Sequence, residues 1–146
     1  MESSPEVAAR RAELEREAPV AARGLWTRVT WNGRDAVFLC GTLGAAFDVW
    51  QRRLSVTGAA DAYLAQQIGL DAVERLMDDL EGEARAAVGD GALLPRRSPG
   101  YGELPLALSR EILDALDATK KIGVSLTAAN LLVPSKSVTA ICEIKA

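Results

Sequence analysis

Residues 25–40 read Leu-Trp-Thr-Arg-Val-Thr-Trp-Asn-Gly-Arg-Asp-Ala-Val-Phe-Leu-Cys, and this stretch decides the fold. Residues 25–31 and 34–40 form two alternating runs, in which every second side chain shares a face, as in a β-strand. Asn32 and Gly33 separate the two runs, and Asn-Gly is the pair that type I′ turns favour because both positions take positive φ. The stretch therefore predicts an antiparallel hairpin. Trp26 and Trp31 fall on opposite faces, so at least one face packs on a helix.

Helical patterns come before and after this hairpin. A Glu/Arg-rich run that follows Ser4-Pro5 predicts an N-terminal helix to about Ala22 that covers the core, with Gly24 as its stop. Two further helices are expected within residues 45–88, a short amphipathic one and a long one from Ala59 to about Val88. Gly69 either divides the long helix or permits a close helix crossing.

The turn over residues 41–44, Gly-Thr-Leu-Gly, joins the hairpin to the first of these helices. A glycine-containing turn before a helix can hold a phosphate at the helix N-terminus. It has only two glycines and no Lys-Ser/Thr ending, so a packing turn is the favoured interpretation.

The last third of the chain predicts a loop over residues 92–105, a helix with Pro105 in its first turn, and two strands. The strands are expected over residues 122–126 and 138–144. Together these elements predict one α+β domain over residues 1–146, divided into a helix (1–24), a hairpin (25–40), helices (45–88), the loop, and a closing helix with strands (105–146). The sheet is expected to be mainly antiparallel, with the helices grouped against one side of it.

Composition excludes several classes of function. The chain has 146 residues, 49% of them hydrophobic and 25% charged, which suits one globular domain with a core of its own. The formal net charge of −3 and the absence of a basic stripe argue against nucleic acid. Because no long apolar run and no signal-like N-terminus is present, we expect a cytoplasmic protein that does not bind membranes.

The side chains that most often carry catalysis or metals are scarce. The chain has no His and two Cys, Cys40 and Cys142, both in apolar, strand-like surroundings. Two Cys without His cannot build a zinc site, and a Ser-His or Cys-His nucleophile is excluded. The Cys residues are therefore expected to be reduced and structural. A chain without His also supplies no axial imidazole to cobalt.

The loop has its own chemistry, because residues 96–105 read Arg-Arg-Ser-Pro-Gly-Tyr-Gly-Glu-Leu-Pro. Pro99 fixes its φ and Gly100 can take a positive φ, so the pair forms a tight bend between Arg96 and Tyr101. Arg96 can bind a carboxylate with two hydrogen bonds, and Tyr101 can stack on a ligand or donate its hydroxyl. Taken alone, such a loop is more often a simple turn.

The wider pattern resembles a known family. The Arg-x-x-Pro-Gly-Tyr motif of residues 96–101, Pro105, the following helix, Ile-Gly-Val-Ser-Leu-Thr at 122–127 and Leu-Val-Pro-Ser-Lys-Ser-Val-Thr-Ala at 132–140 resemble the activation domain of cobalamin-dependent methionine synthase. The likeness covers residues 94–144. Upstream, the turn at residues 42–44 and the long Ala-rich helix are similar to the short, free-standing relatives of that domain.

The resemblance implies a site for S-adenosylmethionine at the loop. Arg96 carries over as the cation for the ligand carboxylate, Pro99 and Gly100 as the bend, and Tyr101 as an aromatic wall. Ser98, which occupies a variable position of the motif, and Gly102 are also expected at the site. Glu74 lines up with an acidic residue that faces the ligand in the family, while its acidic neighbours read as the solvated face of the long helix.

The resemblance also implies partners. A corrinoid-binding methyltransferase subunit, encoded separately, would hold a cobalamin in its inactive cob(II) state. A flavodoxin-like or other low-potential donor would supply one electron, and the methyl of S-adenosylmethionine would restore methylcobalamin, in methionine biosynthesis or another corrinoid pathway. This chain would perform no turnover alone.

Two alternatives remain open. The chain stops soon after residues 137–139 and lacks a later aromatic-containing strand that helps to close the ligand site in the family. It is also shorter between the long helix and the loop. The protein can therefore instead be a docking or assembly subunit of a corrinoid methyltransferase with a vestigial ligand loop, or a protein in which the loop only nucleates a helix.

Overall fold

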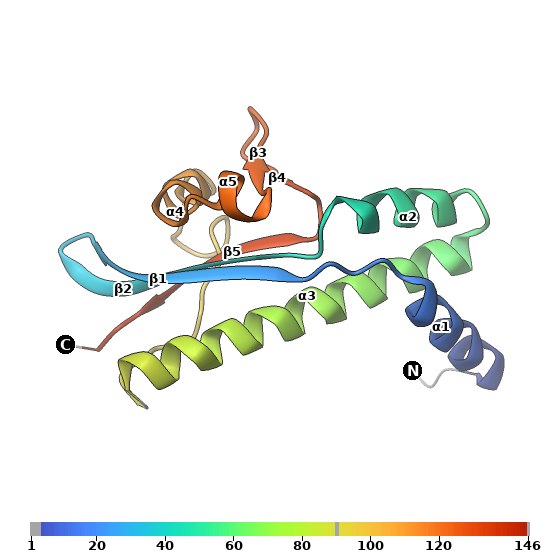
Figure 1. Cartoon of the computed structure of the whole chain (residues 1–146), viewed down its shortest axis with the longest axis horizontal. Coiled ribbons are helices and arrows are strands. Elements are labelled where there is room, and N and C mark those ends of the chain that lie inside the picture. Colours follow the sequence, from blue (N-terminus) through green and yellow to red (C-terminus); the bar gives the residue numbers. More distant parts are fainter. Residues whose placement is uncertain (1–3, 90, 146) are drawn as a thin grey trace.

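The computed structural model describes residues 4–89 and 91–145, and it has the α+β architecture expected from the sequence (Figure 1). The elements in chain order are α1 (Pro5–Glu17), β1 (Arg23–Trp31), β2 (Arg34–Thr42), α2 (Ala45–Ser55), α3 (Ala59–Val88), α4 (Leu108–Leu116), α5 (Ala118–Ile122), β3 (Ser125–Leu126), β4 (Leu132–Val133) and β5 (Ser137–Glu143).

The main sheet has three antiparallel strands in the order β1-β2-β5. The predicted hairpin is confirmed, with Trp31 opposite Arg34 and with positive φ at both Asn32 (51°) and Gly33 (75°). Each strand extends two residues beyond the predicted one, to Arg23 and to Thr42. A separate two-stranded ribbon is formed by β3 and β4.

Helices cover both faces of the sheet, which corrects the expectation that they group against one side (Figure 1). Successive side chains of a strand point to opposite faces. Phe38 and Cys40 of β2 therefore pack with α4 and α5, whereas Val37 and Leu39 pack on α3. Because β2 is the central strand and is apolar on both faces, each face needs its own helical layer.

Helix α3 is one continuous helix, so Gly69 does not divide it. Instead Gly69 is a point of close approach: a Cβ at this position would lie 2.8 Å from the Phe47 ring and 2.8 Å from Lys136 Cε. The N-terminal half of α3 packs with α1 and α2 in a separate core cluster that contains Leu14, Phe47 and Ile68.

Several predicted boundaries are wrong, each for a local reason. Helix α1 ends at Glu17 rather than near residue 22, because Pro19 disfavours helical backbone at Ala18, which is extended (φ −60°, ψ 122°). Helix α4 begins at Leu108, so Pro105 lies before it and only accepts a turn hydrogen bond from the Leu108 N–H.

The predicted strand over residues 122–126 is reduced to β3. Asp117 and Gly123 both take left-handed backbone conformations, and they bound the short helix α5, which contains Ile122. The C-terminal strand is confirmed, shifted by one residue to Ser137–Glu143.

The two cysteines are free and fully buried, as expected. Cys40 lies in the core on the α4 side of the sheet and Cys142 in the core on the α3 side. Since their side chains point to opposite faces, they cannot form a disulfide with each other. Burial raises the pKa of each thiol to about 12.

We predict that neither thiol reacts in the folded protein. With a pKa near 12, the thiolate that attacks a disulfide reagent is a fraction on the order of 10⁻⁴ at pH 8. An aromatic disulfide reagent should therefore release colour from both thiols in denaturant and almost none before unfolding. Rapid reaction of one thiol under native conditions would show that this residue is accessible and has a role beyond packing.

A second prediction compares two glycines of α3. Gly69→Ala should lower the free energy of unfolding by about 1–3 kcal/mol, because the new methyl overlaps the Phe47 ring. Gly82 is the matched control: it is exposed, and a Cβ there meets no atom within 4 Å, so Gly82→Ala should raise stability by about 0.5–1 kcal/mol. Urea unfolding measures both, and equal effects of the two substitutions would contradict the close approach.

Candidate functional site

Backbone pairing fixes the loop against the outer edge of β5. Arg97 and Ile141 exchange two hydrogen bonds of 2.9 and 2.8 Å, and the Leu94 N–H donates to the Glu143 carbonyl at 2.9 Å. This segment behaves as a short fourth strand, so its neighbouring side chains point to opposite faces. Arg97 forms an ion pair with Glu143 at 2.9 Å, while Arg96 points toward α3.

The bend beyond this pairing has the geometry expected from the sequence. Gly100 has a φ of 91°, and its N–H donates to the Leu104 carbonyl at 2.9 Å. Pro99 is buried at the bend, whereas Tyr101 is 76% exposed at its tip. Gly102 also takes a positive φ, 60°. The loop therefore turns away from β5 immediately after it has paired with it.

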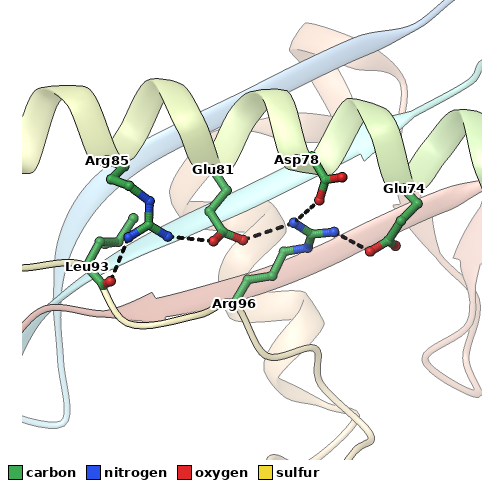
Figure 2. Close-up of polar contacts among 6 residues, drawn as sticks. All are labelled: Glu74, Asp78, Glu81, Arg85, Leu93 and Arg96. Carbon is green, nitrogen blue, oxygen red and sulfur yellow. Dashed lines mark hydrogen bonds and ion pairs between the residues drawn. The ribbon is translucent and has the colours of Figure 1, made fainter. Parts of the chain in front are cut away.

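Arg96 is held by three carboxylates of α3, as Figure 2 shows. One of its terminal nitrogens donates to Asp78 at 2.8 Å and to Glu81 at 2.9 Å, and the other donates to Glu74. Glu81 also accepts from Arg85 at 2.7 Å, and Arg85 donates to the Leu93 carbonyl. Asp78 and Glu81, expected to be part of the solvated face of α3, thus anchor the loop together with Glu74.

Exposure divides the partners of Arg96 into two kinds. The Arg96 and Glu81 side chains are 15% and 17% exposed, whereas those of Glu74 and Asp78 are 69% and 64% exposed. Burial opposes the charge of Arg96, but hydrogen bonds to Asp78 and Glu81 outweigh it, and the pKa of Arg96 stays above its ordinary value. Glu81 is therefore a fixed partner, while Glu74 and Asp78 can be displaced at low cost.

A groove of about 610 Å³ lies beside the loop, between α3, α4, the β3–β4 ribbon and β5. Four of the residues expected at the site line it: Glu74, Ser98, Pro99 and Tyr101. Arg96, Gly100 and Gly102 are not among its lining residues. Arg96 adjoins the groove through Glu74, which contacts both.

The floor of the groove is made of hydroxyl groups that the sequence analysis did not single out. Ser109 and Thr139 are buried and hydrogen-bonded to each other at 2.8 Å, and Ser137 donates to Thr42 at 2.7 Å. The signal for Ser137 and Thr139 was their two-residue spacing on one strand. Ser109 has no such signal, because only the tertiary fold brings it to the site.

The groove also exposes a sheet edge. Ile141 uses its N–H and C=O toward Arg97, so Thr139 and Ser137, two and four residues earlier, direct theirs to the same outer edge. The paired segment ends at Arg97, which leaves this part of the edge facing the groove. Main-chain donors and acceptors of this kind suit the polar rim of a flat heterocycle.

Apolar side chains form the remaining walls. Leu106 and Leu132 line the groove beside Pro99, and Leu131 is 60% exposed at its rim. The charged group among the lining residues is Glu74. A groove with apolar walls, a polar floor and one carboxylate fits a flat organic ligand that carries positive charge.

The described residues, 4–89 and 91–145, contain no group of three or more His, Cys, Asp or Glu side chains arranged to hold a metal ion. Across the same part of the chain, no helix combines the length and the apolar character that crossing a membrane requires.

No family model and no curated protein matches the chain. Among solved structures, its fold is similar to one described as "Crystal Structure of the MetH Reactivation Domain bound to AdoHcy", with a TM-score of 0.63 and 18% sequence identity. The alignment covers 75% of this chain and 39% of the other, so the protein spans about two-fifths of the length of that structure. At this identity, the likeness shows a shared fold.

Proposed function

We propose that the protein binds S-adenosylmethionine in the groove and acts as an accessory domain in the reductive remethylation of a corrinoid methyltransferase. One observation carries the proposal: four residues expected at the site from the sequence line a single groove in the structure, namely Glu74, Ser98, Pro99 and Tyr101. The fold similarity to a reactivation domain bound to AdoHcy supports the same class of ligand.

The Arg96–Glu74 ion pair complements the amino-acid end of this ligand. An α-amino acid carries an ammonium and a carboxylate side by side, which can exchange with an ion pair of the protein. The ligand carboxylate would replace Glu74 on Arg96, and Glu74 would pair with the ligand ammonium. Because the Glu74 side chain is 69% exposed, breaking its bond to Arg96 costs about 0–1 kcal/mol.

The rest of the groove suits the nucleoside. Tyr101 and Leu131 would cover the faces of the adenine, and the outward main-chain groups of Thr139 would meet its polar rim. The Ser109–Thr139 pair has one hydroxyl hydrogen beyond the one it uses internally, which can donate to a ligand oxygen or nitrogen.

The protein would bind and orient the methyl donor, and a partner would hold the cobalamin. The partner is a corrinoid-binding methyltransferase subunit of the cytoplasm, for instance one that serves methionine biosynthesis. A flavodoxin-like or other low-potential donor would reduce the cobalt by one electron. Once the cobalt is reduced, the methyl group of S-adenosylmethionine would be transferred from sulfur to cobalt, and AdoHcy would be released.

We predict that Arg96→Ala weakens S-adenosylmethionine binding about 10- to 150-fold, because a hydrogen bond to a charged group contributes about 1.5–3 kcal/mol. The matched control is Arg97→Ala, since Arg97 is adjacent but pairs with Glu143 outside the groove. Its affinity should stay within about two-fold of the wild type. Calorimetry on the three proteins measures this.

Glu74→Gln tests the proposed exchange of partners. The substitution keeps the shape of the side chain and removes its charge, so it should weaken binding if Glu74 pairs with the ligand ammonium. Tighter binding would mean that Glu74 only competes for Arg96. If the wild type binds nothing at millimolar ligand, or if Arg96→Ala matches the wild type, the ligand assignment is wrong.

A docking or assembly subunit is the second candidate, and two observations favour it. The guanidinium of Arg96 already pairs with three carboxylates of the protein, as expected for the arginine of a vestigial loop that no longer binds a ligand. Apolar side chains are also exposed near the groove: Tyr101, Leu106, Leu131 and Val133. In that case a corrinoid protein should bind this chain equally well with and without S-adenosylmethionine.

We further predict that the protein accelerates remethylation only in trans. A partner loaded with cob(II)alamin, given S-adenosylmethionine and a low-potential reductant, should form methylcobalamin faster when this protein is present, and the corrinoid absorbance reports it. The same rate with and without the protein would rule out reactivation and leave the docking role. If Tyr101→Ala supports the reaction as well as the wild type does, Tyr101 is not part of the ligand site, although the reactivation role of the protein still stands.

A further inference from the structure

A second hollow, of about 470 Å³, lies between α2, α3 and the residues that lead into β5. It is separate from the groove, and Ser135 is the residue that lines both. All of its lining residues have polar side chains, and they include Asp48, Gln51, Arg52, Gln66 and Lys136. The proposed methyl-donor site makes no use of these groups.

Lys136 is a buried cation with spare hydrogen-bond donors. It is 8% exposed, and its ammonium donates to the Gln66 side-chain carbonyl at 2.8 Å. An ammonium has three N–H donors. In residues 4–89 and 91–145, no carboxylate forms an ion pair with it. Burial lowers the pKa of Lys136, and the charge of Asp48 only partly opposes that shift.

Asp48 is the acidic side chain of the hollow, and it is already occupied. Its two carboxylate oxygens accept from the Ser135 N–H and the Ser135 hydroxyl, each at 2.8 Å. It therefore holds the turn before β5 instead of pairing directly with Lys136. The charge of this cation is left without a contacting counterion among the described residues.

Further donors face the same hollow. Gln66 accepts from Gln51 at 2.7 Å as well as from Lys136, so the carbonyl of its amide is used and its NH₂ group can donate. Arg52, exposed in the last turn of α2, lines the hollow, and the ion pairs of the described residues do not include it. The two cations, Arg52 and Lys136, outnumber the one carboxylate, Asp48, so the lining has a net positive charge, and the Gln66 amide adds a neutral donor.

The packing keeps Lys136 inside. Its stem passes directly over Gly69, where a Cβ would lie 2.8 Å from Lys136 Cε. Glycine is unfavourable in the middle of a helix, yet here its missing side chain makes the room that the lysine occupies. The ammonium therefore stays in the hollow, whereas most lysines extend their charge into water.

We propose that this hollow is a binding site for a small oxyanion, the phosphoryl or carboxylate group of a metabolite, held by Lys136 and Arg52. An oxyanion supplies the missing counter-charge and accepts hydrogen bonds from several converging donors at once. Such charge-assisted hydrogen bonds are stronger than neutral ones. This site is independent of the proposed methyl-donor groove, and its test needs neither S-adenosylmethionine nor a corrinoid.

The experiment is a titration of the whole protein with sodium phosphate and, separately, sodium acetate, with sodium chloride keeping the ionic strength constant. Chemical shifts of the Gln66 side-chain amide, followed by NMR, should saturate with one of these anions. Lys136→Met keeps the stem and removes the charge, and it should weaken binding about 10- to 150-fold. Arg52→Gln should weaken binding as well.

Matched controls are Arg53→Gln, next to Arg52 but outside the lining of the hollow, and Lys120→Met on the exposed surface of α5. Both should bind as the wild type does. Saturation by phosphate or by acetate supports the site, and the tighter anion names the ligand class. If Lys136→Met fails to fold, the comparison of anion affinity between Arg52→Gln and Arg53→Gln still tests the proposal. No saturation at constant ionic strength, or equal loss in Arg52→Gln and Arg53→Gln, would overturn the proposal.

Discussion

The structure depends on the burial of β2 on both of its faces. Residues 36–42 are all buried, so this strand has no face toward water. A sheet with one buried face needs a single helical layer, but a sheet whose central strand is apolar on both faces needs two helical layers. Helix α3 supplies one layer, and α4 with α5 supplies the other. The helix before the loop and the helices after it therefore lie on opposite faces of the sheet (Figure 1).

The site follows from how the edge of this sheet is shared. The outer edge of β5 is covered where Arg97 pairs with Ile141 and opens where the chain bends at Pro99. The Pro-Gly bend therefore ends the covering segment as well as shaping the loop. The cluster around Arg96 holds that segment to α3 from the other side (Figure 2). Edge pairing and ion pairing together give the groove its fixed wall.

Local patterns predicted the fold better than the site. The Asn32-Gly33 turn, the long helix and the C-terminal strand are predicted by local residue patterns alone, without knowledge of the tertiary structure. All three are confirmed. The two-sided layering was missed because alternation in β2 shows apolar residues on each face without saying which helix covers it. The boundary errors arise where single residues, such as Pro19, outweigh a periodic pattern.

Site residues were predicted by resemblance, and their contacts lie beyond what a sequence shows. Glu74, Ser98 and Tyr101 do line one groove. The ion pairs that Arg96 forms with Glu74, Asp78 and Glu81 could not be foreseen. Those partners are spaced at one or two helical turns along α3, a spacing that also describes a solvated face. Only the position of the loop makes them ligands of a cation.

Helix α3 belongs to two cores, and this has a consequence for how the protein opens. At about 1.5 Å per residue its 30 residues span roughly 45 Å, longer than the strands it covers. One half packs with α1 and α2, and the other packs under the sheet. We therefore expect the end with α1 and α2 to open as a subglobal unit while the sheet stays folded. Hydrogen exchange along α3 would then change near Gly69, giving one helix two different protection levels.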